Sequence, residues 1–449
     1  MSSSSRLTLD RADGAVSAPP RLSERHFRLL IVGAFIGYFL LLVQLYDRIV
    51  APRFAFGSFV LDPAPGGIVV PLGLVILASF LTPAYVRRVS DLFVWLSMLL
   101  LLVPAAVLAA RQNSDIGALV MMFTGVAAVM LFRGLYERLQ IIKSLPPLPP
   151  EDVSINWAVM VGISVLVLFL LIAQSGGRFS LSFADVYDLR FDFNEQLGFP
   201  LNYLLPFAGG PLSGLIVGAA MRRRNYLLVA LAVVFGVLFF GFSTHKALLF
   251  YPPFALMGYF LMRVRLGGLA VLALLSVLSI ATMAVSGGAE DILGSSFANR
   301  LIFIPAQIHY FFFREFADIG FQYWAESRLS LGLVRSNLPI DSVNYIGLLM
   351  TGNAAVGANT GWIANGYMNL GIIGILFYAA LLGGILYYLD KISDRYGASF
   401  IAASFIIPVS NFVNSIDLLA GALTGGFLLL VGVFMLTVRP ARARSNADG

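Results

Sequence analysis

Long apolar runs alternate with short polar segments along most of this 449-residue chain. Twelve of the runs approach the length of about 20 residues that a helix needs to cross the hydrocarbon core of a bilayer. Because lipid cannot satisfy exposed backbone groups, spans of this kind form helices. The pattern predicts an all-α polytopic membrane protein with about twelve transmembrane helices. The predicted spans lie near residues 27–46, 67–86, 92–110, 116–133, 156–174, 200–220, 226–242, 247–262, 266–286, 362–389, 398–414 and 418–437.

Composition supports the same class and removes several functions. Hydrophobic residues make up 59% of the chain and charged residues only 12%, far from the average of soluble domains. With no cysteine and three histidines, we expect no disulfide, no metal site and no cofactor. Nucleotide-binding and metalloprotease motifs are absent from the sequence. The net charge of +6 is better explained by basic residues at the inner ends of helices than by nucleic acid.

The two ends of the chain are polar. Residues 1–26 contain Ser, Ala and Pro without an apolar period, which predicts a disordered cytosolic tail. The first apolar run lacks a small-residue cleavage site and leads straight into further spans, so it is not read as a cleavable signal. Residues 27–439 are predicted to form a single transmembrane domain, and residues 440–449 a second short cytosolic tail.

Basic residues indicate the orientation of the chain. An even number of spans places both termini on one side, and 20 of the 30 lysines and arginines fall on that side. Because positively charged loops stay in the cytoplasm, both termini are predicted to be cytoplasmic. The other ten basic residues are then outside: Arg48, Arg53, Arg111, Arg178, Arg190, Lys246, Arg300, Arg314, Arg328 and Arg335.

Two outer loops carry most of the candidate chemistry. Residues 175–199 alternate acidic, basic and aromatic residues, and residues 287–361 are the one long polar stretch of the second half. Residues 301–313 of the long loop are apolar, but this run is too short to cross a bilayer. A thirteenth span there would also reverse the charge bias of the loops that follow. We therefore expect short interfacial or re-entrant helices in this extracytoplasmic loop.

Outward-facing cations are the first candidate site residues. Lys246 lies in the turn between two short spans, Arg190 follows an acidic and aromatic run, and Arg300 begins the apolar run of the long loop. Arginine binds phosphate in a bidentate manner, and lysine acts as a point charge. The alternative is that each cation extends to lipid headgroups. His309 is either a general base, since imidazole titrates near neutral pH, or a packing residue.

The segment that closes the long loop is rich in amides and glycines. Asn359, Asn365 and Asn369 are interspersed with four glycines between residues 361 and 374. Amide side chains bind hydroxyls or cap helices, and glycine lets another backbone come close. Small residues at this spacing are also typical of helix packing in membranes. Both interpretations stay open for this segment.

Several segments resemble the O-antigen and exopolysaccharide repeat-unit polymerases of the Wzy type. They fall between about residues 160 and 388, and the first four spans are similar only in topology. The resemblance is carried by the turn Phe242-Ser243-Thr244-His245-Lys246, by Asp185–Arg190, by Arg300–Pro305 with His309–Phe313, by Ala358–Gly361 and by Asn369–Gly374.

The resemblance implies a membrane glycosyltransferase at the periplasmic face of the bacterial inner membrane. In such polymerases, a hydroxyl of one undecaprenyl-diphosphate-linked oligosaccharide attacks the anomeric carbon of another, and the lipid diphosphate departs. The implied partners are the lipid-linked oligosaccharide, the membrane, a chain-length regulator and a flippase, with no nucleic acid. The residues implied as catalytic are Arg190, Lys246, Arg300 and His309, and those implied in substrate binding are Tyr187, His245, Asn359, Asn365 and Asn369.

Three other functions stay open. An O-antigen ligase uses similar chemistry on a different acceptor. A secondary transporter needs ionisable residues and broken helices near the membrane midplane and internal symmetry, whereas these spans are almost free of charge and the two halves look dissimilar. A structural role in an envelope assembly is the third. Polar residues are concentrated at the outer ends of the spans, and this distribution favours the polymerase.

Overall fold

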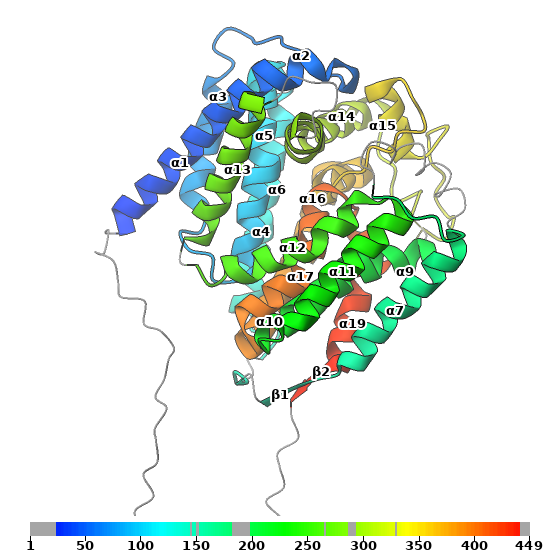
Figure 1. The fold of residues 1–449 in the computed structure, drawn as a ribbon. Helices are drawn as coiled ribbons and strands as arrows, with labels where there is room; N and C mark the ends of the chain where they lie inside the picture. Colours follow the sequence, from blue (N-terminus) through cyan, green and yellow to red (C-terminus); the bar gives the residue numbers. More distant parts are fainter. Residues whose placement is uncertain are drawn as a thin grey trace, which may run out of the picture.

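A computed structural model of the chain describes residues 24–143, 146–149, 152–181, 198–264, 266–285, 293–327 and 330–440. Helices make up nearly all of the regular structure in these residues, and two short strands, β1 and β2, form the remainder (Figure 1). Many of the helices are apolar and long enough to cross a bilayer. The predicted class, an all-α polytopic membrane protein, is confirmed.

The first half of the described chain runs from α1 to α11. Several long helices contain a π-helical stretch, in which each hydrogen bond reaches one residue further along the chain. The bounds are α1 Glu24–Leu45, η1 Tyr46–Val50, α2 Ala51–Arg53, η2 Ala55–Gly57, α3 Val69–Leu81, α4 Val89–Ser97, η3 Met98–Leu102, α5 Val103–Arg111, α6 Ile116–Arg138, β1 Val153–Ile155, α7 Trp157–Gln174, α9 Leu201–Phe207, η5 Ala208–Leu212, α10 Ser213–Arg222 and α11 Tyr226–Ser243.

The second half runs from α12 to the strand β2. It contains the longest helix of the described chain, α16, with 35 residues. The bounds are α12 Lys246–Leu261, α13 Gly267–Val285, η6 Leu293–Phe303, α14 Ile304–Ile319, α15 Ser342–Thr351, α16 Trp362–Tyr396, α17 Ala398–Asn414, α18 Leu418–Leu423, α19 Phe427–Thr437 and β2 Val438–Pro440.

Each of the twelve predicted spans contains helix, but the helices are not equally long. Within the described residues, nine helices are long and apolar enough to cross a membrane. The predicted spans at 67–86, 247–262 and 398–414 correspond to the shorter helices α3, α12 and α17. With 13 residues, α3 extends over about 20 Å, which is less than the hydrocarbon core. The count of twelve crossings therefore stays a prediction.

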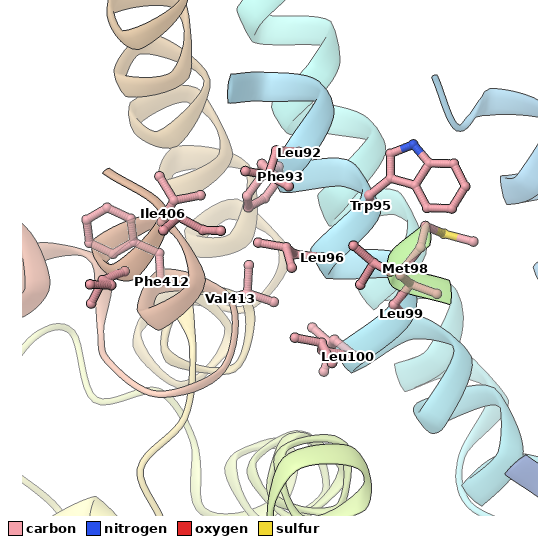
Figure 2. Packing of buried hydrophobic residues seen from close by; sticks show 14 of the residues in the cluster. Leu92, Phe93, Trp95, Leu96, Met98, Leu99, Leu100, Ile406, Phe412 and Val413 are labelled. Carbon is pink, nitrogen blue, oxygen red and sulfur yellow. The ribbon is translucent and has the colours of Figure 1, made fainter. Parts of the chain in front are cut away.

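A continuous helix made of α4, η3 and α5 lies at the centre of the bundle. The most apolar window of this helix is 94% buried, the largest share among the spans of the described chain. Figure 2 shows that Leu96 points towards Val413 of α17, whereas Trp95 points away from it. On that other side, the indole of Trp95 packs against Gly268 of α13, where an added Cβ would lie 2.1 Å from the ring. Apolar side chains on both faces make this helix the core of the fold.

The two ends of the bundle differ in structure. Strand β1 pairs antiparallel with β2, and both lie at the opposite end from α2, α14 and α15 (Figure 1). We call the end with β1 and β2 the strand end, and the end with α15 the cavity end. At the strand end the loops contact each other: the Leu148 amide donates to the Arg395 carbonyl at 2.8 Å, and Arg222 donates to the Leu148 carbonyl at 2.9 Å. The basic residues of the sequence predict that the loops containing Leu148, Arg222 and Arg395 lie together on the cytoplasmic side of the membrane.

A buried ion pair also lies towards the strand end. Asp390 of α16 accepts hydrogen bonds from Arg133 of α6 at 2.9 Å and from the backbone and hydroxyl of Ser90 at 3.1 and 2.7 Å. Arg133 additionally pairs with Glu137, one turn further along α6. The network joins α4, α6 and α16, whose apolar faces pack together. Each charge in it has an opposite charge beside it.

The connectors predicted to lie outside meet at the cavity end. Ser58 donates to the Met350 carbonyl at 2.8 Å, and the Gln307 amide donates to the Ser58 carbonyl at 2.9 Å. An ion pair at 2.6 Å between Arg111 and Asp47 ties the end of α5 to η1. These contacts join three connectors that are far apart in the sequence, so this end is a packed layer.

The apolar run at 301–313 is helical, as expected. It forms the end of η6 and most of α14, and α14 packs against α5 and α16. Residues from Pro305 to Phe313 are all buried, so within this layer the helix is enclosed by protein. The aromatic rings of α14 therefore serve as core for the cavity end.

Candidate functional site

A cavity of about 410 Å³ lies at the cavity end of the bundle. Its volume falls within the range of small-molecule binding sites. Residues from five separate parts of the chain line it: Tyr203 of α9; Trp324, Glu326 and Ser327 of the loop after α14; Ser342 and Val343 of α15; Asn365, Met368 and Asn369 of α16; and Asp417, Leu419, Ala420, Leu423 and Thr424 at α18. Segments that the sequence separates by more than 200 residues thus share one surface.

A break in α16 shapes one wall of the cavity. Leu370 and Gly371 leave the helical conformation, with φ of −154° and +61° respectively. A Cβ at Gly371 would lie 2.6 Å from the ring of Phe321, so both the positive φ and the space require glycine here. Gly366 and Gly374 approach so closely across the break that a Cβ at Gly374 would lie 2.0 Å from the Gly366 carbonyl. The glycines of the closing segment therefore allow the break.

The break frees carbonyl groups that would otherwise bond within the helix. The Met368 carbonyl accepts from the Gln322 amide at 2.9 Å, and the Asn369 carbonyl accepts from the Tyr323 amide at 3.1 Å. In this way the loop after α14 docks on α16 through its backbone. Tyr323 and Trp324 both have positive φ, of 48° and 59°. This conformation costs L-residues about 1–2 kcal/mol each, so the surrounding contacts must hold it in place.

Asn369 is the residue that holds this strained loop. Its Oδ1 accepts from the Trp324 amide at 2.7 Å, and its Nδ2 donates to the Asn365 carbonyl at 2.8 Å. Asn365 in turn donates from Nδ2 to the carbonyls of Thr360 and Gly361 at 3.1 and 3.0 Å. Both amides therefore support the backbone of the broken helix while they line the cavity.

The indole of Trp324 belongs to a hydrogen-bonded chain. Its Nε1 donates to the Tyr378 hydroxyl at 2.9 Å, and that hydroxyl donates to Asp417 Oδ1 at 2.7 Å. The other carboxylate oxygen of Asp417 accepts from the Ala420 amide at 2.9 Å and caps α18. Phe377 lies edge-on to Trp324, with ring centroids 5.8 Å apart. Trp324 and Asp417 are consequently fixed relative to each other before any ligand binds.

Glu326 is held by the start of α15. Its two oxygens accept from the backbone amide and the hydroxyl of Ser342 at 2.7 and 2.6 Å. The Glu326 side chain lies on the cavity surface, as does that of Asp417. No lysine, arginine or histidine is among the described residues that line the cavity. The described lining is therefore acidic, with two aromatic residues, Tyr203 and Trp324, and several hydrogen-bond acceptors.

The structure brings together only part of the predicted substrate-binding set. Asn365 and Asn369 line the cavity and are 7% and 3% exposed. Asn359 is exposed and does not line it. His245 is the N-cap residue of α12 and also lies outside the cavity lining. Tyr187 lies outside the described residues.

Of the predicted catalytic residues, Lys246, Arg300 and His309 are described, and none of these three lines the cavity. Lys246 is the first residue of α12 and is half-buried, and Arg300 is exposed on η6. Thr244, with φ of 59°, makes the turn that separates α11 from Lys246. Arg190 lies outside the described residues. A common phosphate site for these three cations therefore stays a prediction.

His309 is enclosed by protein. Its ring is fully buried, and Nδ1 donates to the Pro305 carbonyl at 2.7 Å, with the Thr360 hydroxyl 3.3 Å away. Since Nδ1 carries the proton, Nε2 carries the lone pair, and no described residue donates to it. Burial lowers the pKa of His309 to about 4, so the ring is neutral at physiological pH. This geometry is that of the packing residue considered above.

The sequence did not single out Trp324 or Asp417. Trp324 lies inside the long loop between arginines that drew attention for their charge, and Asp417 is one acid in a three-residue connector. A signal for Asp417 existed: an acid directly before an apolar helix is a helix cap. Nothing in the sequence indicated that this cap faces an indole more than 90 residues away.

The described residues contain no group of three or more His, Asp or Glu side chains placed to hold a metal ion. Comparison of the chain with protein-family models, with curated proteins and with solved structures gives no match.

Proposed function

We propose that the protein is a membrane glycosyltransferase that joins undecaprenyl-diphosphate-linked oligosaccharide units into a surface polysaccharide. The observation that carries the proposal is the cavity lined by Trp324, Asn365 and two carboxylates. Sugars present an apolar ring face and a rim of hydroxyls, which suit an aromatic plate surrounded by hydrogen-bond acceptors. Lipid-linked sugars would reach such a cavity at the membrane boundary.

The position of the break in α16 supports a site at that boundary. The helix after the break runs from residue 372 to Tyr396 and extends over about 38 Å. This segment alone is long enough to cross the hydrocarbon core, so the break and the cavity lie near one membrane surface. We propose twelve crossings with the strand end in the cytoplasm, because basic residues are concentrated in its loops. The cavity end is then periplasmic.

The proposed reaction divides the work between two sets of residues. A glycan in the cavity presents a hydroxyl, whose oxygen bonds to the anomeric carbon of the second glycan while the bond from that carbon to the diphosphate oxygen breaks. The hydroxyl proton passes to a base, and Glu326 and Asp417 are already at the cavity surface. Arg190, Lys246 and Arg300 are the proposed ligands of the departing diphosphate, whose growing charge they would stabilise.

Purified protein and lipid-diphosphate-linked repeat units test the proposal directly. We expect a ladder of products. Trp324→Ala should shorten or abolish the ladder with a rate loss of about tenfold or more, because the sugar loses its ring contact. Trp157→Ala, at the start of α7, is the matched control and should leave the ladder unchanged.

The proposed cation role has its own test. Arg300→Ala should slow polymerisation by about a hundredfold at normal membrane levels, and Arg300→Lys should slow it substantially, because lysine keeps the charge but loses the bidentate geometry. Arg335→Ala is the control. Wild-type rates for Arg300→Ala would assign Arg300 to the lipid headgroups instead.

Two observations keep a second function, transport, as a candidate. A broken helix such as α16 and a buried charge pair such as Arg133–Asp390 also occur in secondary transporters, although there they lie near the membrane midplane. Proteoliposomes separate the two functions, since a transporter would accumulate a labelled solute without lengthening any glycan. A ligase would instead transfer one finished chain to a different lipid acceptor and give a single product.

A further inference from the structure

We infer that the cavity binds the glycan that supplies the attacking hydroxyl. It accepts glycans whose bound sugars are neutral or carry an amine, and it rejects glycans whose bound sugars carry a uronate or a phosphate. The inference rests on the proposed function for the identity of the ligand as a glycan. It adds the substrate class of the cavity and separates the sugar subsite from the diphosphate subsite.

Charge is the first argument. Glu326 and Asp417 both line the cavity, and the described lining residues include no basic side chain. Hydrogen bonds from Ser342, Tyr378 and the Ala420 amide hold the two carboxylates in place. Within the described lining, a carboxylate or phosphate on the ligand would meet like charge and no basic side chain. An ammonium group would meet opposite charge.

The direction of the hydrogen bonds is the second, independent argument. Four polar donors around the cavity are engaged within the chain: Asn365 Nδ2 with Thr360 and Gly361, Asn369 Nδ2 with Asn365, Trp324 Nε1 with Tyr378, and the Thr424 hydroxyl with the Ala420 carbonyl.

Several hydrogen-bond acceptors at the cavity surface remain available to a ligand. Asn365 lines the cavity and is only 7% exposed, and its described side-chain hydrogen bonds use only Nδ2. Its Oδ1 can therefore accept a hydrogen bond from a ligand. Each carboxylate oxygen also has a further lone pair. A ligand that satisfies this surface must bring donors, which hydroxyls and ammonium groups do and ionised carboxylates do not.

A neutral sugar in the acidic cavity is also consistent with the position of the described cations outside its lining. Lys246 and Arg300 do not line the cavity. A diphosphate bound there would face two carboxylates, whereas a neutral sugar would not. The two substrates of a glycan polymerase therefore require two surfaces of opposite charge, and the acidic one is the cavity.

A glycan array tests the inference. Because the chain has no cysteine, one introduced cysteine gives a single fluorescent label on the full-length protein in nanodiscs. The array carries neutral, amine-bearing, uronate-bearing and phosphate-bearing glycans. We expect binding to neutral and amine-bearing glycans. For each neutral glycan that binds, the matching glycan with a uronate in place of the neutral sugar should bind at least about tenfold more weakly at low ionic strength.

Variants assign the effect to the cavity. Asp417→Asn and Glu326→Gln should each reduce the discrimination against the uronate, and the double variant should nearly remove it. Asp62→Asn makes the same change of charge on an exposed outer connector and is the matched control. Trp324→Ala should weaken binding of every glycan without changing the ranking.

Three outcomes overturn the inference. They are equal or tighter binding of anionic glycans, discrimination that survives the double variant, and no glycan binding by a protein that still makes the product ladder. The last of these leaves the proposed function intact. If the ranking holds but lipid-linked units are never joined, the cavity is a glycan site in a protein of another function, and the proposed reaction is the part that fails.

Discussion

Helix α16 connects two polar clusters that are built in opposite ways. Towards the strand end, Asp390 is buried against Arg133 and Ser90, and Arg133 also pairs with Glu137. At the cavity end, Asp417 is bonded to Tyr378 of the same helix, and no described basic residue lines the cavity beside it. One carboxylate is neutralised within the chain, whereas the other is held rigidly and left with free acceptor capacity.

This difference separates a structural role from a binding role. A charge enclosed by helices is costly unless it is paired, so the pair at Asp390 is what folding alone requires. Folding does not require two carboxylates and a strained tryptophan on an open cavity. Conformations of this kind cluster at functional sites, where the surrounding structure holds them for a ligand.

The largest effect is expected from Asp390→Asn. The substitution keeps the shape and a hydrogen bond to Ser90 but leaves Arg133 without its buried partner. Breaking a buried pair in this way costs about 3–5 kcal/mol, and the remaining Glu137 contact places the change near the lower bound. Thermal unfolding in detergent measures it. Asp394→Asn, on the exposed face of the same helix, is the control and should be nearly silent.

If Asp390→Asn unfolds at the wild-type temperature, the Arg133–Asp390 pair does not stabilise the fold. A double variant that replaces Arg133 and Asp390 by apolar residues of similar size sharpens the comparison. It should recover most of the lost stability, because no unpaired charge remains.

The second effect concerns the break that positions the cavity. Gly371→Ala places a Cβ at a positive φ and 2.6 Å from the Phe321 ring, so we expect a loss of about 2 kcal/mol. Glycan binding should weaken with it, because the displaced loop carries Trp324. Gly384→Ala, where the nearest side-chain atom is 3.5 Å away, is the control and should be neutral or slightly stabilising. Unchanged binding in Gly371→Ala would show that the break does not position the cavity.

The sequence predicted the helices but not the cavity, and the reasons are physical. Apolar runs are long and local, so all twelve helical segments could be located from periodicity and length. The glycines at 361–374 predicted close backbone approach, and the structure shows a broken helix with such an approach between Gly366 and Gly374. The site also needs the loop after α14 and the α18 cap. Their meeting depends on how the helices pack, which a single sequence does not encode in any local pattern.

The emphasis on cations has a related explanation. Arginine and lysine are conspicuous in an apolar chain, so they attract attention as ligands for phosphate. Trp324, Glu326 and Asp417 are individually ordinary, and their value lies in their shared hydrogen-bonded surface. A charged residue can be recognised in the sequence, whereas a surface of unsatisfied hydrogen-bond acceptors can be recognised only in the folded structure.

The third effect is a loss of stability in mild acid. Burial keeps His309 neutral in the fold with a pKa of about 4, whereas the unfolded chain binds the proton near pH 6.5. Because the unfolded state binds more protons between these values, stability is full above about pH 6.5 and falls as the pH drops towards 4. The loss should be on the order of 1 kcal/mol at pH 5.5.

His309→Asn separates this contribution from the acids of the chain. Asparagine can still donate to the Pro305 carbonyl but does not titrate in this range. The pH dependence of thermal unfolding should become shallower between pH 6.5 and 4 in this variant. An identical slope in the two proteins would mean that His309 is solvated and free to titrate, which would return it to the list of candidate bases.

The smallest effect on stability, and the sharpest contrast, is expected from Asp417→Asn. The chemical change is the same as at Asp390, but here no buried cation loses its partner. Asparagine caps helices about as well as aspartate, and one amide oxygen can still accept from Tyr378 or from the Ala420 amide. The loss should therefore stay below about 1 kcal/mol. Discrimination between neutral and anionic glycans should nevertheless fall, because half of the acidic charge of the cavity is gone. If Asp417→Asn destabilised the protein as much as Asp390→Asn, both clusters would be structural, and the distinction between the two ends of α16 would not hold.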